Sequence, residues 1–387
     1  MPWRQVTVLG QRLEFCRLVE AGGVPTAELC RRFGVSRKTA YKWLSRFSVD
    51  GEAGLENRSC TPTRSPARTG VEVEGLVCGV REKHPAWGGR KIRGFLLRQG
   101  HLEVPAASTI GQILRRRGLV GEPIRPRAYC SFERPAPNDL WQMDFKGSFP
   151  LADGQPVHTL GVLDDHSRFN LCLAACTDQQ TATVKALLVA TFRHYGLPQA
   201  MLTDNGSPWG NTIGEPWTPL TVWLADLGVK PVHSRPRHPQ TAGKEERFHR
   251  TLDLEVISTR PTWDSYPQVQ GAYDSWRPIY NHHRPHQSLG ETVVPADRYQ
   301  PSPRPYPEHI DPPDYPDGSD IRHVGACGRF SWRGHLRRAG RAFAGKTVAV
   351  RPTTTDSTYT VYYRHHPIRT INLSPMSPNT RHPSPRS

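Results

Sequence analysis

The alternation of short apolar runs with amphipathic segments between Asp139 and Leu252 is the feature that most constrains this fold. Runs of β-type residues alternate with stretches of helical periodicity, and turn residues separate them. The predicted strands are 140–149, 158–164, 169–177, 199–204 and 229–234, and the predicted helices are 181–196, 219–228 and one that opens near Gly243. The order β, β, β, α, β, α, β, α predicts a mixed sheet with helices, which is an α/β fold.

Charge is distributed unevenly along the chain, whose formal net charge is +16. Residues 1–135 contain 24 Lys and Arg against 12 Asp and Glu, whereas residues 136–300 contain 14 against 17. Residues 301–387 return to a basic excess, with 13 against 6. Two basic arms around a slightly acidic centre indicate arms that hold nucleic acid and a centre with another task.

The first basic segment has the pattern of a helix-turn-helix. Thr26 caps a short helix, Gly34 supplies the turn, and Ser36 caps a second helix. In this motif the first residues of the second helix contact bases and phosphates in the major groove of DNA. We therefore predict a DNA-binding domain at 1–56, with an ordinary helical hairpin as the alternative. The predicted DNA contacts are Arg37, Lys38, Thr39 and Lys42.

Three further segments are expected outside the centre. A second pair of short helices, with Arg115, Arg116 and Arg117 outward, predicts another helix-turn-helix-like domain at 71–122. Short β-rich segments predict a small basic β-barrel at 319–373, and the proline- and serine-rich residues 374–387 predict a disordered tail. The centre itself is predicted as one domain at 136–300.

The eight cysteines do not form a metal-binding pattern, because no CxxC pair and no Cys/His cluster occurs. Free thiols of this kind indicate a reducing, cytoplasmic setting. No apolar run approaches the roughly 18 residues of a membrane span. The first residues lack the apolar region of a signal peptide. We therefore expect a cytoplasmic protein without a membrane partner.

Three acidic residues stand apart from the surface charges that most Asp and Glu side chains form. Asp144 lies within a predicted strand, and Asp204 ends another strand at the sheet edge, where sites of α/β proteins tend to form. Glu246 lies where a helix opens. Three converging carboxylates can hold divalent metal ions, and two such ions support phosphodiester chemistry.

Two adjacent glutamates, Glu245 and Glu246, open that helix. Adjacent side chains on a helix point about 100° apart, so only one of the two can face Asp144 and Asp204. The spacing of the residues alone does not choose between them.

The segments WQMDFKG, LDDHSRF, LTDNG, HPQTAGKEERFHRTL and YNHHRPHQSLG together resemble the integrase-type catalytic core of bacterial insertion-sequence transposases, akin to retroviral integrases. The resemblance covers roughly 139–299 and implies a ribonuclease-H-like fold with a DDE triad. It implies that Asp144 and Asp204 are the two aspartates. The GKxER motif selects Glu246 as the glutamate and leaves Glu245 as its solvated neighbour.

Three basic or acidic residues near the triad also receive expected roles. Lys244 and Arg247 are predicted to contact DNA phosphates, because a phosphodiester must lie beside the carboxylates. Asp165 is predicted to bond the backbone of its own turn together with Ser167, which is a structural role.

The resemblance implies a DDE transposase that uses two Mg²⁺ (or Mn²⁺) ions held by Asp144, Asp204 and Glu246. Such an enzyme cleaves DNA at the ends of its element and joins the freed 3′-hydroxyl to target DNA. The helix-turn-helix units would recognise the terminal inverted repeats, and a homo-multimer is expected because two ends are joined. The alternatives are an inactive or domesticated transposase that acts as a DNA-binding regulator, and a ribonuclease-H-like nuclease.

Overall fold

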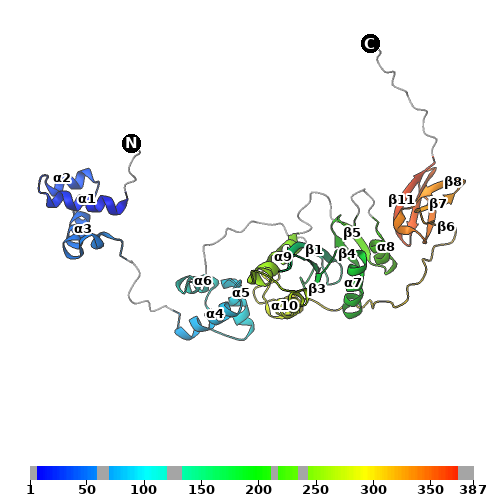
Figure 1. Cartoon of the computed structure of the whole chain (residues 1–387), viewed down its shortest axis with the longest axis horizontal. Coiled ribbons are helices and arrows are strands. Elements are labelled where there is room, and N and C mark those ends of the chain that lie inside the picture. Colours follow the sequence, from blue (N-terminus) through cyan, green and yellow to red (C-terminus); the bar gives the residue numbers. More distant parts are fainter. Residues whose placement is uncertain (1–6, 59–68, 120–132, 211–216, 234–242, 374–387) are drawn as a thin grey trace, which may run out of the picture. The chain divides into compact units, whose positions relative to one another are not determined.

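The computed structural model describes residues 7–58, 69–119, 133–210, 217–233 and 243–373 (Figure 1). The chain divides into two compact units, Met1–Arg68 and Thr69–Ser387. The tail predicted at 374–387 lies outside the described residues.

The first unit is a helical domain with a short turn before its last long helix. Its elements are α1 (Val8–Glu20), α2 (Thr26–Arg32), α3 (Arg37–Asp50) and the 3-10 helix η1 (Gly51–Leu55). Ser36 caps α3, because its side chain accepts a hydrogen bond of 3.1 Å from the backbone N–H of Thr39. Phe15, Leu29 and Ala40 are buried where the helices meet. The predicted helix-turn-helix geometry is therefore formed by α2 and α3.

A second group of three helices opens the other unit. It consists of α4 (Val71–Lys83), α5 (Gly89–Arg98) and α6 (Ala107–Arg116). Trp87, Ile92 and Ile113 are buried at its centre. Arg115, Arg116 and Arg117 are exposed, as expected, and Arg116 and Arg117 also pair with the buried carboxylate of Glu74.

The centre is built on a five-stranded sheet with the strand order β3-β2-β1-β4-β5. The strands are β1 (Trp141–Pro150), β2 (Pro156–Asp164), β3 (Asn170–Cys176), β4 (Ala200–Thr203) and β5 (Lys230–His233). The first three strands pair antiparallel, whereas β4 is parallel to both β1 and β5. The predicted α/β order and the mixed sheet are confirmed.

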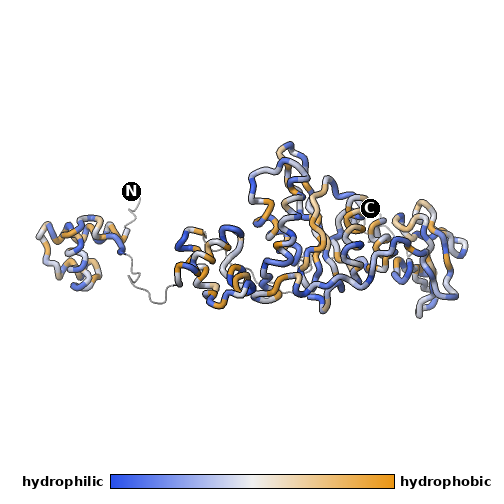
Figure 2. The backbone as a smooth tube through the Cα atoms, turned by 90° about the horizontal axis from the view of Figure 1, so that it is seen from below, coloured by the Kyte–Doolittle hydropathy of each residue, from blue (hydrophilic) through white to orange (hydrophobic). Residues whose placement is uncertain are grey.

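Helices cover both faces of this sheet, with α7 and α8 on one side and α9 and α10 on the other (Figure 1). Their bounds are α7 (Thr181–Tyr195), α8 (Pro219–Asp226), α9 (Gly243–Glu255) and α10 (Tyr266–Pro278). The short helix η2 (Ile257–Thr259) lies between α9 and α10, and η3 (Ile279–His283) and η4 (Pro295–Asp297) come after α10. Strand β1 divides its side chains between the two faces. Trp141 and Met143 pack under α7 and α8, so the alternate residues Gln142, Asp144 and Lys146 face α9. The apolar strands run through the middle of this region in Figure 2.

The C-terminal region consists of β-strands whose sheets are distinct from the five-stranded sheet of the core. Its elements are β6 (Asp320–His323), β7 (Arg329–Trp332), β8 (His335–Arg338), the 3-10 helix η5 (Arg341–Phe343), β9 (Thr347–Pro352), β10 (Thr358–Tyr363) and β11 (His366–Asn372). Within the described residues these strands form an open sheet of order β11-β10-β9-β6 and a hairpin of β7 and β8. The predicted closure into a barrel is not confirmed.

Helix α8 joins the C-terminal sheets to the core. Its residues Val222 and Ala225 are buried within the apolar cluster of the C-terminal region. At the end of α8, Asp226 accepts hydrogen bonds from Lys346 Nζ (2.7 Å), Arg364 Nε (3.1 Å) and the Tyr363 hydroxyl. Apolar packing and one buried carboxylate therefore hold the two parts together.

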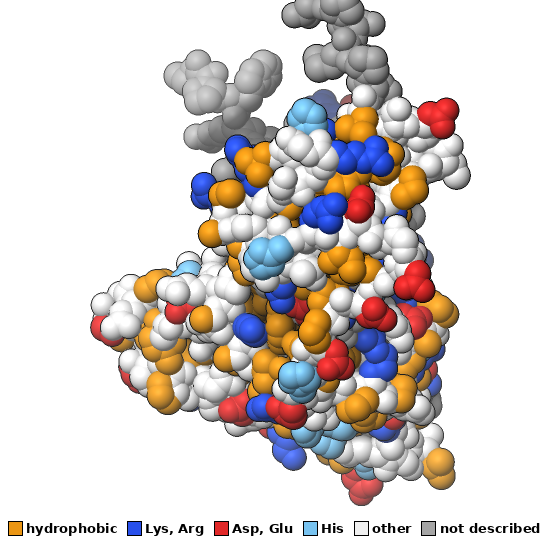
Figure 3. Space-filling view, turned by 90° about the vertical axis from the view of Figure 1, so that its right-hand side faces the viewer, with side chains coloured by type: hydrophobic (Ala, Val, Ile, Leu, Met, Phe, Trp, Pro, Cys, Tyr) orange, Lys and Arg blue, Asp and Glu red, His pale blue; other side chains and the backbone are white. Residues whose placement is uncertain are grey.

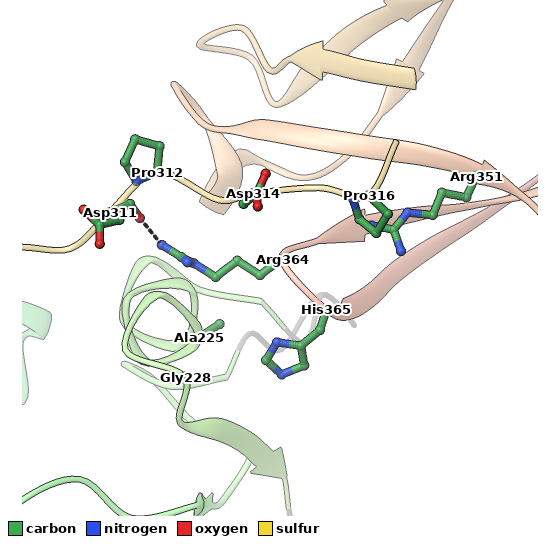
Figure 4. A pocket seen from close by; sticks show the side chains of 9 residues that line it. All are labelled: Ala225, Gly228, Asp311, Pro312, Asp314, Pro316, Arg351, Arg364 and His365. Atoms are coloured by element: carbon green, nitrogen blue, oxygen red, sulfur yellow. Dashed lines mark hydrogen bonds between the residues drawn. The ribbon is translucent and has the colours of Figure 1, made fainter. Parts of the chain in front are cut away.

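A cavity of about 480 Å³ lies beside this junction (Figure 4). Arg364 lines it and donates a hydrogen bond to the backbone carbonyl of Asp311, and Arg351 donates one to Ser319 at 3.1 Å. The cavity is distant in sequence from Asp144, Asp204 and the glutamates, and none of them lines it. It belongs to the junction.

The surface seen in Figure 3 mixes Lys and Arg side chains with acidic and apolar ones. The described part of the chain has no helix that is long and apolar enough to cross a membrane.

Candidate active site

Asp144 on β1 and Asp204, which directly follows β4, lie at the same level of the sheet. Strands β1 and β4 are parallel with Gln142 opposite Leu202, and each aspartate comes two residues later in the chain. Burial, together with the negative charge of Asp204, raises the pKa of Asp144 to about 6. The two acids therefore lie near each other, while their role in catalysis stays a prediction.

The loop after β4 fixes the carboxylate of Asp204. Its Oδ1 accepts a hydrogen bond of 2.9 Å from the backbone N–H of Gly206 and another from the indole Nε1 of Trp209. Trp209 is 1% exposed, and its ring stacks on Phe145 with 5.4 Å between centroids. Sequence reasoning missed Trp209. The available signal was an aromatic donor five residues after an acid that ends a strand.

A polar stripe of α9 faces the polar row of β1. His249 Nδ1 lies 4.0 Å from the carboxylate of Asp144, and Asp253 pairs with Lys146 at 3.1 Å. Burial, together with the charge of Lys146, lowers the pKa of His249 to about 4, so His249 is neutral near pH 7. The stripe runs alongside β1, because His249 and Asp253, one helix turn apart, meet Asp144 and Lys146, which are alternate residues of the strand.

The two adjacent glutamates differ in environment. Glu245 is 6% exposed, and its Oε1 has no hydrogen-bond partner among the residues that the structure describes. Burial raises the pKa of Glu245 well above its usual value, with further contributions from Asp144 and Asp204. The prediction that Glu245 is the solvated neighbour is therefore wrong. Phe248 and Leu252 pack into the core from the same face of α9 and turn Glu245 inward with them.

Glu246 is exposed at the start of α9. It precedes His249 by three residues and Asp253 by seven, which places all three on one stripe of the helix. Among the described residues, no three His, Cys, Asp or Glu side chains lie close enough to hold a metal ion. The charge of Asp204 acts on Asp144, and both act on Glu245, whereas the predicted triad with Glu246 stays a prediction.

Lys244 does not have the position expected of a DNA contact. Its Nζ lies 2.5 Å from Oδ1 of Asp165, which also accepts a hydrogen bond from Gln142. The side chain of Lys244 is only 14% exposed. The expected phosphate contact through Lys244 is corrected to a structural ion pair that ties α9 to the turn after β2.

The role predicted for Asp165 belongs to Asp164. Asp164 Oδ1 accepts hydrogen bonds from the backbone N–H of Ser167 at 2.7 Å and from its hydroxyl at 2.6 Å. Asp165 instead accepts hydrogen bonds from Lys244 Nζ and Gln142 Nε2. The structural role predicted for Asp165 thus holds in kind, but its partners are Lys244 and Gln142, while Asp164 makes the contacts with Ser167.

The remaining predicted DNA contacts lie on exposed surfaces. Arg37, Lys38 and Lys42 are exposed on α3, whereas Thr39 is half-buried and its hydroxyl lies 2.9 Å from that of Ser36. Arg247 is exposed on α9. The exposed side chains are available to a ligand, while Thr39 helps to cap its own helix.

Family models match most of the chain. Two models described as an integrase core domain match residues 134–239 and 227–293. A model of the C-terminal domain of IS481 family transposases matches 319–379. A helix-turn-helix domain matches 11–65, and a homeodomain-like domain matches 39–114.

Individual proteins show the same similarity. An uncharacterized 39.2 kDa protein of the insertion element IS476 from Xanthomonas euvesicatoria is 31% identical over 273 residues, which cover 69% of this chain and 75% of that protein. The transposase InsD of insertion element IS2-9 from Escherichia coli (strain K12) is 27% identical and covers 73% of this chain and 91% of its own length. The HTLV-2 integrase catalytic core domain in complex with magnesium matches 43% of this chain and 99% of its own, with 13% identity and a TM-score of 0.33.

Proposed function

The chain belongs to the insertion-sequence transposases that contain an integrase-type core, and we propose that this core cuts and joins DNA at Asp144, Asp204 and Glu246. The closeness of Asp144 on β1 to Asp204, which directly follows the adjacent parallel strand β4, carries the proposal. Neighbouring carboxylates repel each other unless a proton or a cation lies between them. Such a pair is an expected arrangement for a metal-dependent nucleotidyl transferase.

The donor set fits Mg²⁺ or Mn²⁺. Both ions prefer oxygen ligands, and carboxylates are their usual protein donors. The raised pKa of Asp144 reflects burial and the charge of Asp204, which a cation would offset. Asp144, Asp204 and Glu246 would hold two such ions. When bound, divalent ions lower the pKa of an attacking water or hydroxyl and stabilise the leaving oxygen.

Glu246 is proposed as the third ligand because of its place on α9. It shares a stripe with His249 and Asp253, and these two side chains reach the polar row of β1. Glu245 is buried, and burial together with the charges of Asp144 and Asp204 raises its pKa well above its usual value. Glu246 is exposed, so it can reach a metal ion from the solvent side.

The proposed reaction has two displacement steps. Water attacks the phosphorus at an end of the element, the P–O3′ bond breaks, and the products are a 3′-hydroxyl and a 5′-phosphate. That 3′-hydroxyl then attacks a phosphodiester of target DNA, joins the element to it and releases a new 3′-hydroxyl on the target strand. The neutral His249 beside Asp144 is placed to keep the carboxylate oriented.

The helical regions would select the DNA. The exposed basic start of α3 fits the major-groove contacts of a helix-turn-helix, with Arg37, Lys38 and Lys42 as contacts to the inverted repeats. Because two ends are joined, we propose that a homo-multimer assembles on the DNA.

One experiment tests the enzyme activity. Purified protein is incubated with Mg²⁺ and labelled DNA that carries the element's inverted repeats, and cleaved and joined products are separated on a gel. Wild type is expected to form both products, while Asp204→Asn forms neither and still binds DNA. Equal products from both proteins would overturn the proposal.

The alternatives give different outcomes in the same assay. A DNA-binding regulator would bind the repeats and form no product with any metal. A ribonuclease-H-like nuclease would cleave without joined products. The helix-turn-helix unit and the aspartate pair together favour the transposase.

A further inference from the structure

Helix α5 is docked on the segment 284–298, which follows η3 and which we call the strap. Arg98 forms a two-fold ion pair with Asp297, with N···O distances of 2.7 and 2.8 Å, and Arg93 pairs with Glu291. At Gly94 a Cβ atom would lie 2.0 Å from the carbonyl oxygen of Glu291, so no larger residue fits. The α4–α6 group and the catalytic core therefore meet along a close seam.

Three cations gather at one end of this seam. Lys91 comes from α5, Arg247 from α9 and Arg284 from the strap. Arg284 Nη2 lies 3.5 Å from Oγ1 of Thr251, one turn after Arg247 on α9, and Pro285 lies against Gly94, one turn after Lys91 on α5. Burial, with contributions from the charges of Arg284 and Arg247, lowers the pKa of Lys91 to about 8. Burial also lowers the pKa of the nearby His286 to about 3, and the same three cations and Arg168 contribute.

The local carboxylates do not balance these charges. Glu255 is the acid that faces Lys91, and its two oxygens are occupied by Arg284 Nε at 2.9 Å and Trp276 Nε1 at 3.0 Å. Within the described ranges, Lys91 and Arg247 have neither a hydrogen bond nor an ion pair from their side chains. The three cations thus face one carboxylate, which is already bound.

Like charges brought together in a partly buried place destabilise the fold unless an anion joins them. Arg284 is 5% exposed, its Nε donates to Glu255 and its Nη2 lies 3.5 Å from Thr251 Oγ1. Within the described residues its Nη1 has no hydrogen-bond partner, so it can donate to an oxyanion. We propose that Lys91, Arg247 and Arg284 bind a backbone phosphate of DNA at the seam between the α4–α6 group and the catalytic core. This inference rests on the proposed function, because that function brings DNA to this surface.

The site would link two parts of the DNA contact. Arg247 lies one residue after Glu246 on α9, and Lys91 lies near the start of α5. A phosphate held by both would fix the DNA backbone between the helical reader and the carboxylates. Phosphate contacts of this kind set the register of a protein on a duplex and carry no sequence information.

The test measures how salt weakens DNA binding. Binding of full-length protein to a labelled duplex of arbitrary sequence is followed by fluorescence anisotropy at several NaCl concentrations. Each lost phosphate contact lowers the slope of log K against log[salt] by about 0.9 on duplex DNA. Lys91→Gln and Arg247→Gln are each expected to lower the slope by about this amount. Lys185→Gln, on the exposed side of α7 across the sheet, is the matched control and should keep the wild-type slope.

Charge-retaining and surface variants separate binding from folding. Lys91→Arg should keep the wild-type slope if the charge is what matters, whereas a packing defect would affect both Lys91 variants. Arg247→Gln changes an exposed side chain, so its DNA binding remains informative if Lys91→Gln lowers the unfolding temperature of the protein. Wild-type slopes in both Gln variants would overturn the phosphate site and leave the transposase proposal intact. Failure of the wild type to bind DNA would instead overturn the proposed function.

Discussion

The indole Nε1 of Trp209 donates a hydrogen bond to Oδ1 of Asp204. The same oxygen accepts the backbone N–H of Gly206, and the indole ring is buried against Phe145, which follows Asp144 on β1. The orientation of one carboxylate thus depends on an aromatic ring that also packs beside the other carboxylate's strand. Trp209 acts as a positioning residue for Asp204.

Trp209→Phe should weaken metal binding while the fold is kept. Phenylalanine retains the stacked ring and loses the N–H donor, and loss of such a supporting contact typically weakens metal affinity by about 10-fold or more. Titration with Mn²⁺ by calorimetry measures the change. Trp223→Phe, a buried tryptophan on α8, is the control that should bind Mn²⁺ as wild type does. Equal affinities for the two variants would show that Trp209 only fills space.

The two glutamates should differ in a paired substitution. Glu246→Gln should abolish DNA cleavage, because an amide is a poor ligand for Mg²⁺. Glu245→Gln should keep activity, because an amide of the same shape replaces a buried carboxyl whose raised pKa favours its neutral form. Gel assays of cleavage with both proteins measure the difference. The opposite pattern would make Glu245 the third ligand.

Much of this site was predictable from sequence, but which of the two glutamates is buried was not. The two aspartates end or interrupt apolar strands, and strand patterns show which residues lie at a sheet edge. The rotation of α9 about its axis depends on how Phe248 and Leu252 pack on the sheet, and it decides which glutamate is buried. Local patterns do not contain that information. Likewise, the pattern did not show that Asp164, and not Asp165, bonds Ser167 within the turn.

The tight contact at Gly94 predicts opposite effects for two Gly→Ala substitutions in neighbouring helices. Gly94→Ala places a methyl group against the backbone of the strap and should destabilise the protein by about 1–3 kcal/mol. Gly75→Ala in α4 meets no atom within 4 Å and should stabilise it by roughly 0.5–1 kcal/mol, because alanine favours the helix. Urea unfolding measures both. A neutral Gly94→Ala would mean that α5 does not dock on the strap.

Asp226→Asn should loosen the C-terminal sheets from the core. Burial favours the neutral acid, but hydrogen bonds from Lys346, Tyr363 and Arg364 outweigh it and lower the pKa of Asp226. An amide leaves the two basic partners without their anion and should weaken the junction by about 1–3 kcal/mol. Limited proteolysis of the connecting segment 301–318 should become faster. Asp356→Asn, an exposed change within the same sheets, should leave the cleavage rate at the wild-type value.

The half-buried His286 predicts a pH dependence of stability. Its pKa is lowered to about 3 in the folded chain, whereas an unfolded histidine takes up a proton near pH 6.5. The stability that depends on the neutral ring is therefore present above about pH 6.5 and is lost as the pH falls toward 3. The unfolding free energy of wild type should drop relative to His286→Asn by at most about 1.4 kcal/mol per pH unit. His309→Asn, at an exposed position, should run parallel to wild type in urea melts between pH 4.5 and 8.

The order of elements was predictable because each apolar run is bounded by turn residues, as at Gly196 and Gly228. The closure of the C-terminal strands was not predictable. Strand patterns give the number of strands but not their partners, and β6 pairs with β9 while β7 pairs only with β8 in the described part of the sheet. Trp209 was missed because the loop geometry that aims its indole at Asp204 has no periodic signature.

The docking of α5 on the strap has a consequence for where the enzyme would cut. If the α4–α6 group reads DNA, its attachment to the core through Arg98 and Asp297 fixes the number of base pairs between the recognised sequence and the bond that is cut. B-DNA turns once in about 10.5 base pairs, so inserting half a turn would rotate the scissile phosphate to the far side of the duplex. Cutting efficiency would then rise and fall with the helical phase of the spacer, and a full turn would restore the angle but not the distance.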